Sequence, residues 1–287
     1  MANVLLTPDV IAREAVMVLV NNLVAAGLVY RSFTSEFAKI GDTVTVRKPT
    51  TFIANDFVEG SNITLQNATE TGVTLKLDKF KDVSFSATSK DLALNINDFS
   101  LQFVQPAMRA LAQQIDSDVL AIANDFPDTY VRGATPVIGD FAQVGKIMND
   151  NKVPTDSRYG VLNTDHFADY ISLENIVRVD ASGTNDALRR ALLGDVLGFE
   201  TYMSQNMPQS TTGKDQSLFF HGNAISLVSA PLDTQGSEFN ASQSYAGVTI
   251  RVAQDYDIKT KTNIYSFDCL YGIQILDENL GVRLVSA

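Results

Sequence analysis

A long polar segment, residues 50–72, constrains the fold most strongly, because it separates two strand-like patterns. Before it, valines alternate with threonine and arginine over residues 41–48. After it, apolar and polar residues alternate over residues 73–86, with a charged middle at residues 78–82. A connection this long is unusual inside a compact domain. The pattern therefore predicts a protruding hairpin over residues 41–86.

A hairpin of this kind needs support, because two isolated strands are marginally stable in water. We expect the support to come from a neighbouring copy of the chain, with charged side chains of the strands forming contacts between subunits. The alternative is a solvated face, since a single exposed ion pair contributes little. The candidate contact residues are Arg47, Lys48, Lys76, Lys79, Lys81, Asp78 and Asp82.

Two helical patterns flank the hairpin. The first begins with a threonine, a proline and an aspartate, which predicts a helix start, and extends over about residues 8–25. Its apolar residues cover more than one face, so we expect contact with a second surface, such as another subunit. The second and longer helix is predicted over residues 99–124, where apolar residues recur at spacings of three and four. Pro106 either kinks this helix or marks its first turn.

The second half of the chain mixes short helices and strands, which indicates an α+β fold. Residues 136–240 are expected to form a second subdomain, with surface loops at 209–216 and 233–244. Its expected elements are helices near 139–151, 165–171 and 185–193, strands near 159–162 and 199–203, and a hydrophobic element at 218–227. The C-terminal part returns to strands at 248–252, 262–269, 273–276 and 282–285.

Composition indicates a globular chain that does not hold nucleic acid tightly. The 287 residues are 45% hydrophobic, and 33 acidic against 22 basic side chains give a net charge of −11, which opposes phosphate binding. An acidic surface can still face packaged DNA without adhering to it. No apolar run approaches the roughly 20 residues of a membrane span, so we expect no membrane segment. The N-terminus lacks signal-peptide features, so the chain is expected to stay in the cytosol where it is made.

We expect no enzyme, cofactor or metal, because no catalytic constellation is present. Nucleophile-elbow, phosphate-loop, dinucleotide and zinc-protease motifs are absent. Of the two histidines, His166 is predicted to have a helix-cap and surface role, and His221 to be hydrogen-bonded at a packed edge. Cys269, the one cysteine, has apolar neighbours and is predicted to be a buried thiol. Asp116 and Asp118 do not share a helix face, so an acid/base pair is disfavoured.

The order of these elements resembles the major capsid proteins of tailed bacteriophages with the Hong Kong 97-type fold. The order is helical arm, long hairpin, long helix, mixed subdomain and returning strands. The most similar branch is the P-twenty-two-type coat protein, without its inserted domain. The match lies at the level of the fold and includes no catalytic signature. The segments that carry the resemblance are LLTPDVIAREAVMVLVNNL, KIGDTVTVRKP, LDKFKDVSFSATSKDL and ALLGDVLGFETYMSQNMP.

The resemblance implies a division of the chain into five parts. They are an N-terminal arm (1–40), an E-loop hairpin (41–86), a peripheral or P domain with a long spine helix (87–135), an axial or A domain (136–240), and C-terminal strands that return to the P domain (241–287).

The resemblance also implies a function and its partners. The chain is expected to self-assemble, as hexamers and pentamers, into an icosahedral shell that encloses the double-stranded DNA of a bacteriophage without sequence-specific binding. A scaffolding protein and a portal are the expected partners, and the location is the virion, after synthesis in the bacterial cytoplasm. The alternative is an encapsulin-like compartment, which has a related fold and encloses protein cargo.

Overall fold

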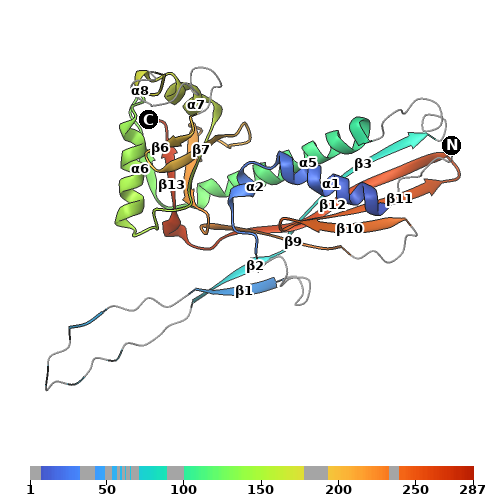
Figure 1. Cartoon of the computed structure of the whole chain (residues 1–287), viewed down its shortest axis with the longest axis horizontal. Helices are drawn as coiled ribbons and strands as arrows, with labels where there is room; N and C mark the ends of the chain where they lie inside the picture. The colour runs from blue at the N-terminus through green and yellow to red at the C-terminus, as the bar shows by residue number, and fades with distance from the viewer. Residues whose placement is uncertain are drawn as a thin grey trace.

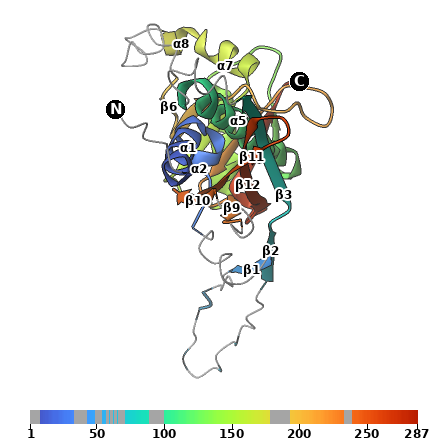
Figure 2. The ribbon, with the colours of Figure 1, turned by 90° about the vertical axis from the view of Figure 1, so that its right-hand side faces the viewer.

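The computed structural model describes residues 8–32, 43–48, 54–56, 59, 62, 65, 71–88, 100–177, 193–232 and 239–287. They form a long body and a short body, each built on a β-sheet, and a hairpin that projects from the long body (Figure 1). Figure 2 shows the long helices on one side of the long sheet and the hairpin on the other. The mixture of helices and sheets confirms the predicted α+β class.

The long body is a five-stranded antiparallel sheet. Its strand order is β10–β11–β12–β3, and β9 also pairs with β12. The 14-residue β12 is the longest strand and organises the sheet, because β3, β11 and β9 all pair with it. The strands are β3 (Lys79–Thr88), β9 (Ile225–Ala230), β10 (Asn240–Tyr245), β11 (Val248–Asp257) and β12 (Thr262–Ile275).

Helices α1 (Pro8–Asn22) and α5 (Gln105–Ala121) cover one face of this sheet, with the short α2 (Ala25–Leu28) beside them. Helix α1 packs against α5 and also against β10 and β11, and its apolar residues lie in the main core. The second surface expected for this helix is therefore the sheet of its own chain. No neighbouring subunit is needed to explain most of its apolar residues.

The long helix is confirmed, and its start explains Pro106. A π-helical turn (Ser100–Val104) precedes α5, and a 3-10 turn (Ile122–Asp125) follows it. Pro106 occupies the first turn of α5, where its missing N–H leaves one carbonyl of the preceding turn without the usual partner. The π-helical turn, which is wider than an α-helical turn, lies at the position of this missing hydrogen bond. The helix therefore continues through the proline.

The strand predicted over residues 73–86 is two strands. Strand β2 (Thr71–Lys76) pairs antiparallel with β1 (Thr43–Lys48), whereas β3 pairs with β12. Two residues outside either strand, Leu77 and Asp78, separate them. The described hairpin therefore ends at Lys76, and the following strand belongs to the body.

The short body is a six-stranded mixed sheet with α6 (Gly139–Asp150), α7 (Thr164–Ile171) and α8 (Glu174–Val177). Strands β4 and β13 are parallel to each other, as are β5 and β7. Aromatic side chains fill its core, including Phe141, Phe199 and Phe219, which meet edge to face. In spatial order the strands are β4 (Thr129–Val131), β13 (Gly281–Val285), β8 (Gln216–His221), β5 (Arg158–Leu162), β7 (Phe199–Met203) and β6 (Asp195–Val196).

Three expectations about the second half differ from the structure. The hydrophobic element at 218–227 is two strands in different sheets, β8 and β9, joined by a turn where the chain crosses between the bodies. Part of the loop expected at 233–244 is the strand β10, which is held by pairing with β11. The final strand β13 pairs with β8 and β4 in the short sheet, so it does not return to the long sheet as β10, β11 and β12 do.

Other expectations agree with the described elements. The predicted helices near 139–151 and 165–171 are α6 and α7, and the strands near 159–162 and 199–203 are β5 and β7. One further expectation differs: the separate strands expected at 262–269 and 273–276 form one continuous strand, β12. The helix expected near 185–193 falls almost entirely outside the described residues.

Candidate functional site

The root of the hairpin is fixed to the long body by a small apolar cluster. Leu75 is 1% exposed and packs with Val228 and Ala230 of β9. Val46, Leu77 and Leu276 pack around these three residues. Alternation along β1 and β2 places Val46 and Leu75 on the same face of the hairpin, so that face turns toward the sheet. The root is therefore attached to the body by side-chain packing as well as by the chain itself.

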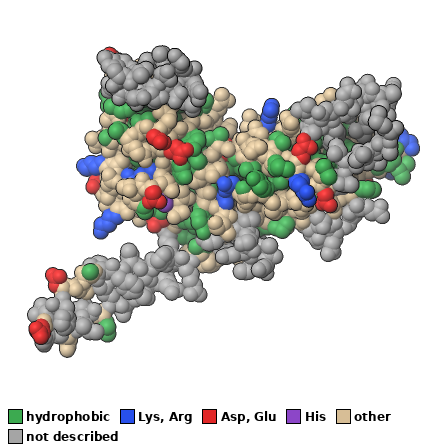
Figure 3. All heavy atoms as spheres, in the orientation of Figure 1, with side chains coloured by type: hydrophobic (Ala, Val, Ile, Leu, Met, Phe, Trp, Pro, Cys, Tyr) green, Lys and Arg blue, Asp and Glu red, His purple; other side chains and the backbone are tan. Residues whose placement is uncertain are grey.

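The opposite face of the hairpin is polar and exposed. Thr45, Thr74 and Lys76 lie on it. Between the two strands in sequence, Asp56, Glu59 and Leu65 are exposed, and Leu65 reaches 83% exposure. Figure 3 shows acidic and hydrophobic side chains at the far end of the projection. Exposed acidic and apolar side chains together suit contact with another protein surface.

Two of the candidate contact residues are held against the body of their own chain. The Nζ atoms of Lys79 and Lys81 lie 3.5 Å and 3.9 Å from a carboxylate oxygen of Asp118 on α5. The same oxygen accepts a hydrogen bond from the Tyr271 hydroxyl at 2.7 Å. Burial and this carboxylate together raise the pKa of Tyr271. The two lysines point toward the helices because they share the inward face of β3 with Phe85.

Among the described side chains, the remaining candidate residues form no ion pair with one another. Lys76, Asp78 and Asp82 are exposed, and Asp82 accepts a hydrogen bond from the Ser84 hydroxyl at 3.1 Å. Arg47 and Lys48 belong to β1, but their side chains lie outside the described part of the structure. A role of these five residues in contacts between subunits stays a prediction.

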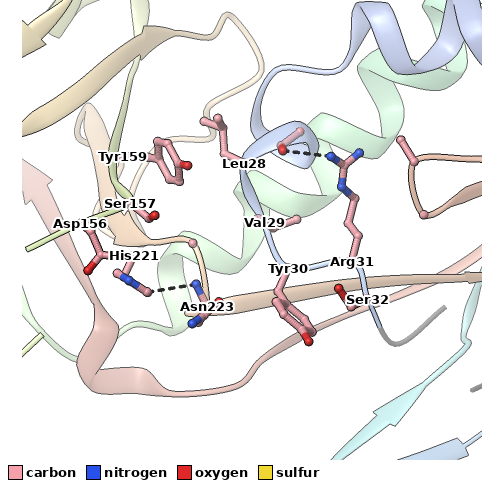
Figure 4. A pocket seen from close by; sticks show the side chains of 14 residues that line it. Leu28, Val29, Tyr30, Arg31, Ser32, Asp156, Ser157, Tyr159, His221 and Asn223 are labelled. Atoms are coloured by element: carbon pink, nitrogen blue, oxygen red, sulfur yellow. Dashed lines mark hydrogen bonds between the residues drawn. The ribbon is translucent and has the colours of Figure 1, made fainter. Parts of the chain in front are cut away.

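A groove lies beside the turn where the chain crosses from β8 to β9 (Figure 4). Its volume is about 610 Å³. The backbone of Tyr30 forms one side through a parallel bridge to Ser226. Its lining residues include Leu28, Arg31, Asp156, Ser157, Tyr159 and His221.

His221 is the chemically most interesting residue of this groove, and its contacts are structural. It is 5% exposed, and its Nδ1 accepts a hydrogen bond from the backbone N–H of Asn223 at 3.2 Å, as expected of a histidine at a packed edge. Burial lowers its pKa. Its Nε2 makes no hydrogen bond within the described structure, so Ser157 and Asp156 do not form a catalytic relay with it.

His166 is buried, so the predicted surface role is wrong. Its backbone N–H is capped by the Asn163 side chain at 2.9 Å, which starts α7. Its ring lies between the hydroxyls of Ser217 and Ser286, at 2.7 Å and 2.8 Å. Burial, and then the nearby charge of Arg132, lower its pKa to about 4. The histidine connects α7 to β8 and to the C-terminal residues of the chain.

Two buried carboxylates that the sequence did not identify as important have structural roles. Asp116 accepts hydrogen bonds from the backbone N–H groups of Val24 and Ala26, at 2.8 Å and 2.9 Å. Asp140 accepts hydrogen bonds from the hydroxyls of Tyr170 and Tyr130, at 2.9 Å and 3.1 Å. Asp116 could not be recognised from local sequence, because its partners are 92 and 90 residues away. Asp140 has one local partner, the backbone N–H of Val137 at 3.0 Å, but its tyrosine partners belong to other elements.

Other reactive or membrane-binding features do not add a site. Cys269 is buried, as predicted, and burial raises the pKa of its thiol to about 12. Within the described residues, no group of three or more histidine, cysteine, aspartate or glutamate side chains could hold a metal ion. Of the helices that the structure describes, none is both long and apolar enough to cross a membrane.

Comparisons with known proteins find similarity in structure alone. No family model matches the sequence, and no curated protein matches it. A solved structure from Mycobacterium phage Che8 matches with a TM-score of 0.71 and 20% identity, over 91% of this chain and 90% of that chain. The capsid structure of Cyanophage P-SCSP1u matches with a TM-score of 0.64 and 15% identity, over 86% and 84% of the two chains.

A third solved structure comes from a different kind of particle. A virus-like particle from Pyrococcus furiosus matches with a TM-score of 0.58 and 9% identity, over 96% of this chain and 97% of that chain. At these identities the matches establish the fold. The chain therefore has the Hong Kong 97-type capsid fold that the sequence resemblance implied.

Proposed function

We propose that this chain is the major capsid protein of a tailed bacteriophage, which self-assembles into an icosahedral shell around double-stranded DNA. The observation that carries the proposal is the structural match to the Che8 phage protein, which covers about nine-tenths of both chains. A match of this extent includes both bodies and leaves little of the chain for a different function. In this proposal the long body is the peripheral domain, the short body is the axial domain, and the hairpin of β1 and β2 acts in contacts between subunits.

The projecting hairpin supports assembly on physical grounds. Two strands alone are marginally stable, and the described packing supports only the root, around Leu75. A neighbouring subunit would supply the missing surface for the outer part. Such a contact joins two different surfaces of identical chains, and contacts of this type close into rings when the geometry allows. Individually weak contacts become strong when many copies engage together.

The charge of the chain supports a shell that encloses DNA without binding it tightly. The net charge of −11 opposes tight binding to phosphates. On the face of the long sheet opposite the helices, Arg251 is paired with Asp268 through Nε and Nη2, at 3.0 Å and 2.5 Å. Asp82 lies directly across the strand pair from Asp268.

A scaffolding protein, a portal and a virion location are further parts of this proposal.

The proposal includes no enzymatic role. The side chains that could act as a base, an acid or a nucleophile make structural contacts instead. His166 contacts two serines, Asp116 accepts from backbone N–H groups, and Cys269 packs in the core. These contacts stabilise the fold and leave none of the three groups open to a substrate. The solved structures with this fold also come from shells.

An encapsulin-like protein compartment is the second candidate. The match to the virus-like particle from Pyrococcus furiosus covers 96% of this chain, which favours it. The TM-score of that match, 0.58, is lower than the 0.71 of the Che8 match, so the phage capsid is the better-supported function.

The experiment that tests the function is isolation of the particles that contain this chain from its native source, followed by analysis of their contents. The phage capsid predicts closed icosahedral particles with nuclease-protected double-stranded DNA. The compartment predicts closed particles that hold a protein cargo and no protected DNA. Small soluble oligomers as the only form found would contradict both functions.

A further inference from the structure

The edges of the two body sheets are protected to very different degrees. Natural proteins prevent unwanted strand addition by keeping edge strands short, by placing charges or prolines in them, or by bulging them. In the short body the edge strands are β4 and β6, with three and two residues. In the long body, the edge strand β3 carries Lys79, Lys81 and Asp82. Each of these edges has a recognisable protection.

Strand β10, at the other edge of the long sheet, has none of these protections. Its six residues, Asn-Ala-Ser-Gln-Ser-Tyr, include no charge and no proline, and its pairing with β11 has no bulge. In the described structure it pairs with β11 alone. Two large aromatic residues lie at its ends, Phe239 and Tyr245, with 54% and 55% exposure. An uncharged, regular edge of six residues can accept an added strand.

The backbone of β10 is oriented to accept such a strand. The N–H of Gln254 donates to the carbonyl of Phe239 at 2.8 Å, so residue 239 and every second residue after it face β11. The backbone groups of Asn240, Ser242 and Ser244 therefore point away from β11. They form a row of donors and acceptors along the edge.

The chain itself carries a strand that needs a partner. Strand β1 has six residues, the same number as β10, and in the described structure it pairs with β2 alone. Its first four residues, Thr-Val-Thr-Val, have high strand propensity. The hairpin projects from the body beyond its packed root (Figure 1), and a two-stranded sheet gains stability when a third strand is added.

We propose that β1 of a second copy of this chain adds to β10 as the next strand of the long sheet. The proposal rests on the proposed assembly and names the surface that receives the hairpin. The alternation of the two strands is compatible with this arrangement. When Thr45 lies on the same face as Ser242, both polar side chains lie on the face of the sheet opposite Ala241, which is buried under the helices.

Disulfide crosslinking tests the contact directly, because the native cysteine does not interfere. Cys269 is the only cysteine and is fully buried. We would co-assemble a Thr45→Cys variant with a second single variant, Asn240→Cys, Ser242→Cys or Ser244→Cys, and then oxidise the particles. Since the two cysteines are on different chains, any disulfide of this kind joins two copies. The matched control pairs Thr45→Cys with Ser84→Cys, on the charged edge strand β3.

The expected result is a covalent dimer for at least one β10 position, and a yield at least tenfold lower for the Ser84→Cys control. Wild-type particles that form normally, with no β10 position crosslinked above the control, would overturn the proposal and leave the proposed function intact. Failure of the wild type to assemble under any condition would instead contradict the proposed function.

A proline at the edge gives an independent test. In Ser242→Pro the lost N–H points away from β11, so the internal strand pairing is retained while strand addition is blocked. We expect this variant to melt within a few degrees of the Ser242→Ala control but to assemble at least tenfold less, whereas Ser242→Ala assembles normally. A folded Ser242→Pro chain that assembles like the wild type would overturn the proposal. If Ser242→Pro does not fold, the crosslinking result decides alone.

Discussion

The backbone of Lys76 passes directly over Gly272 of β12. A Cβ atom at position 272 would overlap the carbonyl oxygen of Lys76 and lie 2.8 Å from its carbonyl carbon. Backbone atoms cannot move aside as the end of a side chain can, so only glycine allows the hairpin to leave the sheet along this path. The root of the hairpin is therefore positioned by one glycine as well as by the cluster around Leu75.

Replacement of this glycine is expected to displace the hairpin without unfolding the bodies. In Gly272→Ala the new methyl group collides with the backbone of Lys76, so the root must shift. We expect faster limited proteolysis within residues 49–70 and a large loss of assembly, with a small change in the melting temperature. The control is Gly27→Ala in α2, where a Cβ atom would meet no heavy atom within 4 Å. An assembly-competent Gly272→Ala would show that the crossing does not position the hairpin.

Asp116 is expected to be the most costly carboxylate of the long body to remove. In Asp116→Ala the N–H groups of Val24 and Ala26 lose their acceptor, and we expect a loss of about 2–3 kcal/mol in the free energy of unfolding. Asp116→Asn keeps one acceptor and is expected to lose less. Urea denaturation measures both, with the exposed Gln113→Ala as the control, which should change stability by no more than about 0.5 kcal/mol. Equal stability of Asp116→Ala and Gln113→Ala would refute the structural role of this carboxylate.

The buried His166 makes stability depend on pH in a defined direction. Its pKa is lowered from 6.5 to about 4, so the unfolded chain binds a proton that the folded chain rejects. The free energy of unfolding should therefore fall as the pH drops from 6.5 toward 4, by up to about 3 kcal/mol from this group. Burial also lowers the pKa of His221, so both histidines act in the same direction.

The contribution of His166 is isolated by comparing pH profiles. Denaturation of the wild type and of His166→Gln between pH 4 and 7 should give a steeper loss of stability in the wild type. The His221→Gln variant is the control and should keep most of the slope. Parallel profiles for wild type and His166→Gln would contradict the assignment of the slope to this residue.

The lysines of β3 are expected to differ from Lys76 in their effect on assembly. Lys79 and Lys81 face Asp118 at partly exposed positions, so Lys79→Met with Lys81→Met should cost less than about 1 kcal/mol of stability and leave assembly intact. Lys76→Glu, on the exposed face of the hairpin, should slow assembly while the monomer stays folded. Light scattering follows assembly in both variants. Loss of assembly in the double methionine variant alone would show that the β3 lysines contact a neighbour.

Alternation in the sequence predicted which faces of the strands are apolar, but it did not predict their partners. The same period of two continues from β2 into β3. In the structure, Leu75 packs on β9, on the side of the sheet away from the helices, whereas Phe85 packs under the helices against Phe267. A period of two carries no information about this exchange of partners, so the sequence indicated one strand instead of two.

Two other differences have the same physical origin. Strand β10 has almost no apolar residues, so its sequence is typical of a loop, and its strand conformation comes from pairing with β11. His166 has polar neighbours in sequence, and its burial depends on Ser217 and Ser286, which are 51 and 120 residues away. By contrast, α1 and α5 were predictable because their helical periodicity is local.

This chain is expected to form a closed shell through its projecting hairpin. Electron microscopy of the purified wild type, beside a variant in which residues 49–70 are replaced by Asn-Gly, tests it most directly. The substitution keeps β1 and β2 and joins them by a turn suited to a two-residue hairpin. We expect closed particles of uniform size from the wild type, and folded monomers or small oligomers from the variant. Intact shells from the variant, or monodisperse monomers from the wild type under all assembly conditions, would contradict the claim.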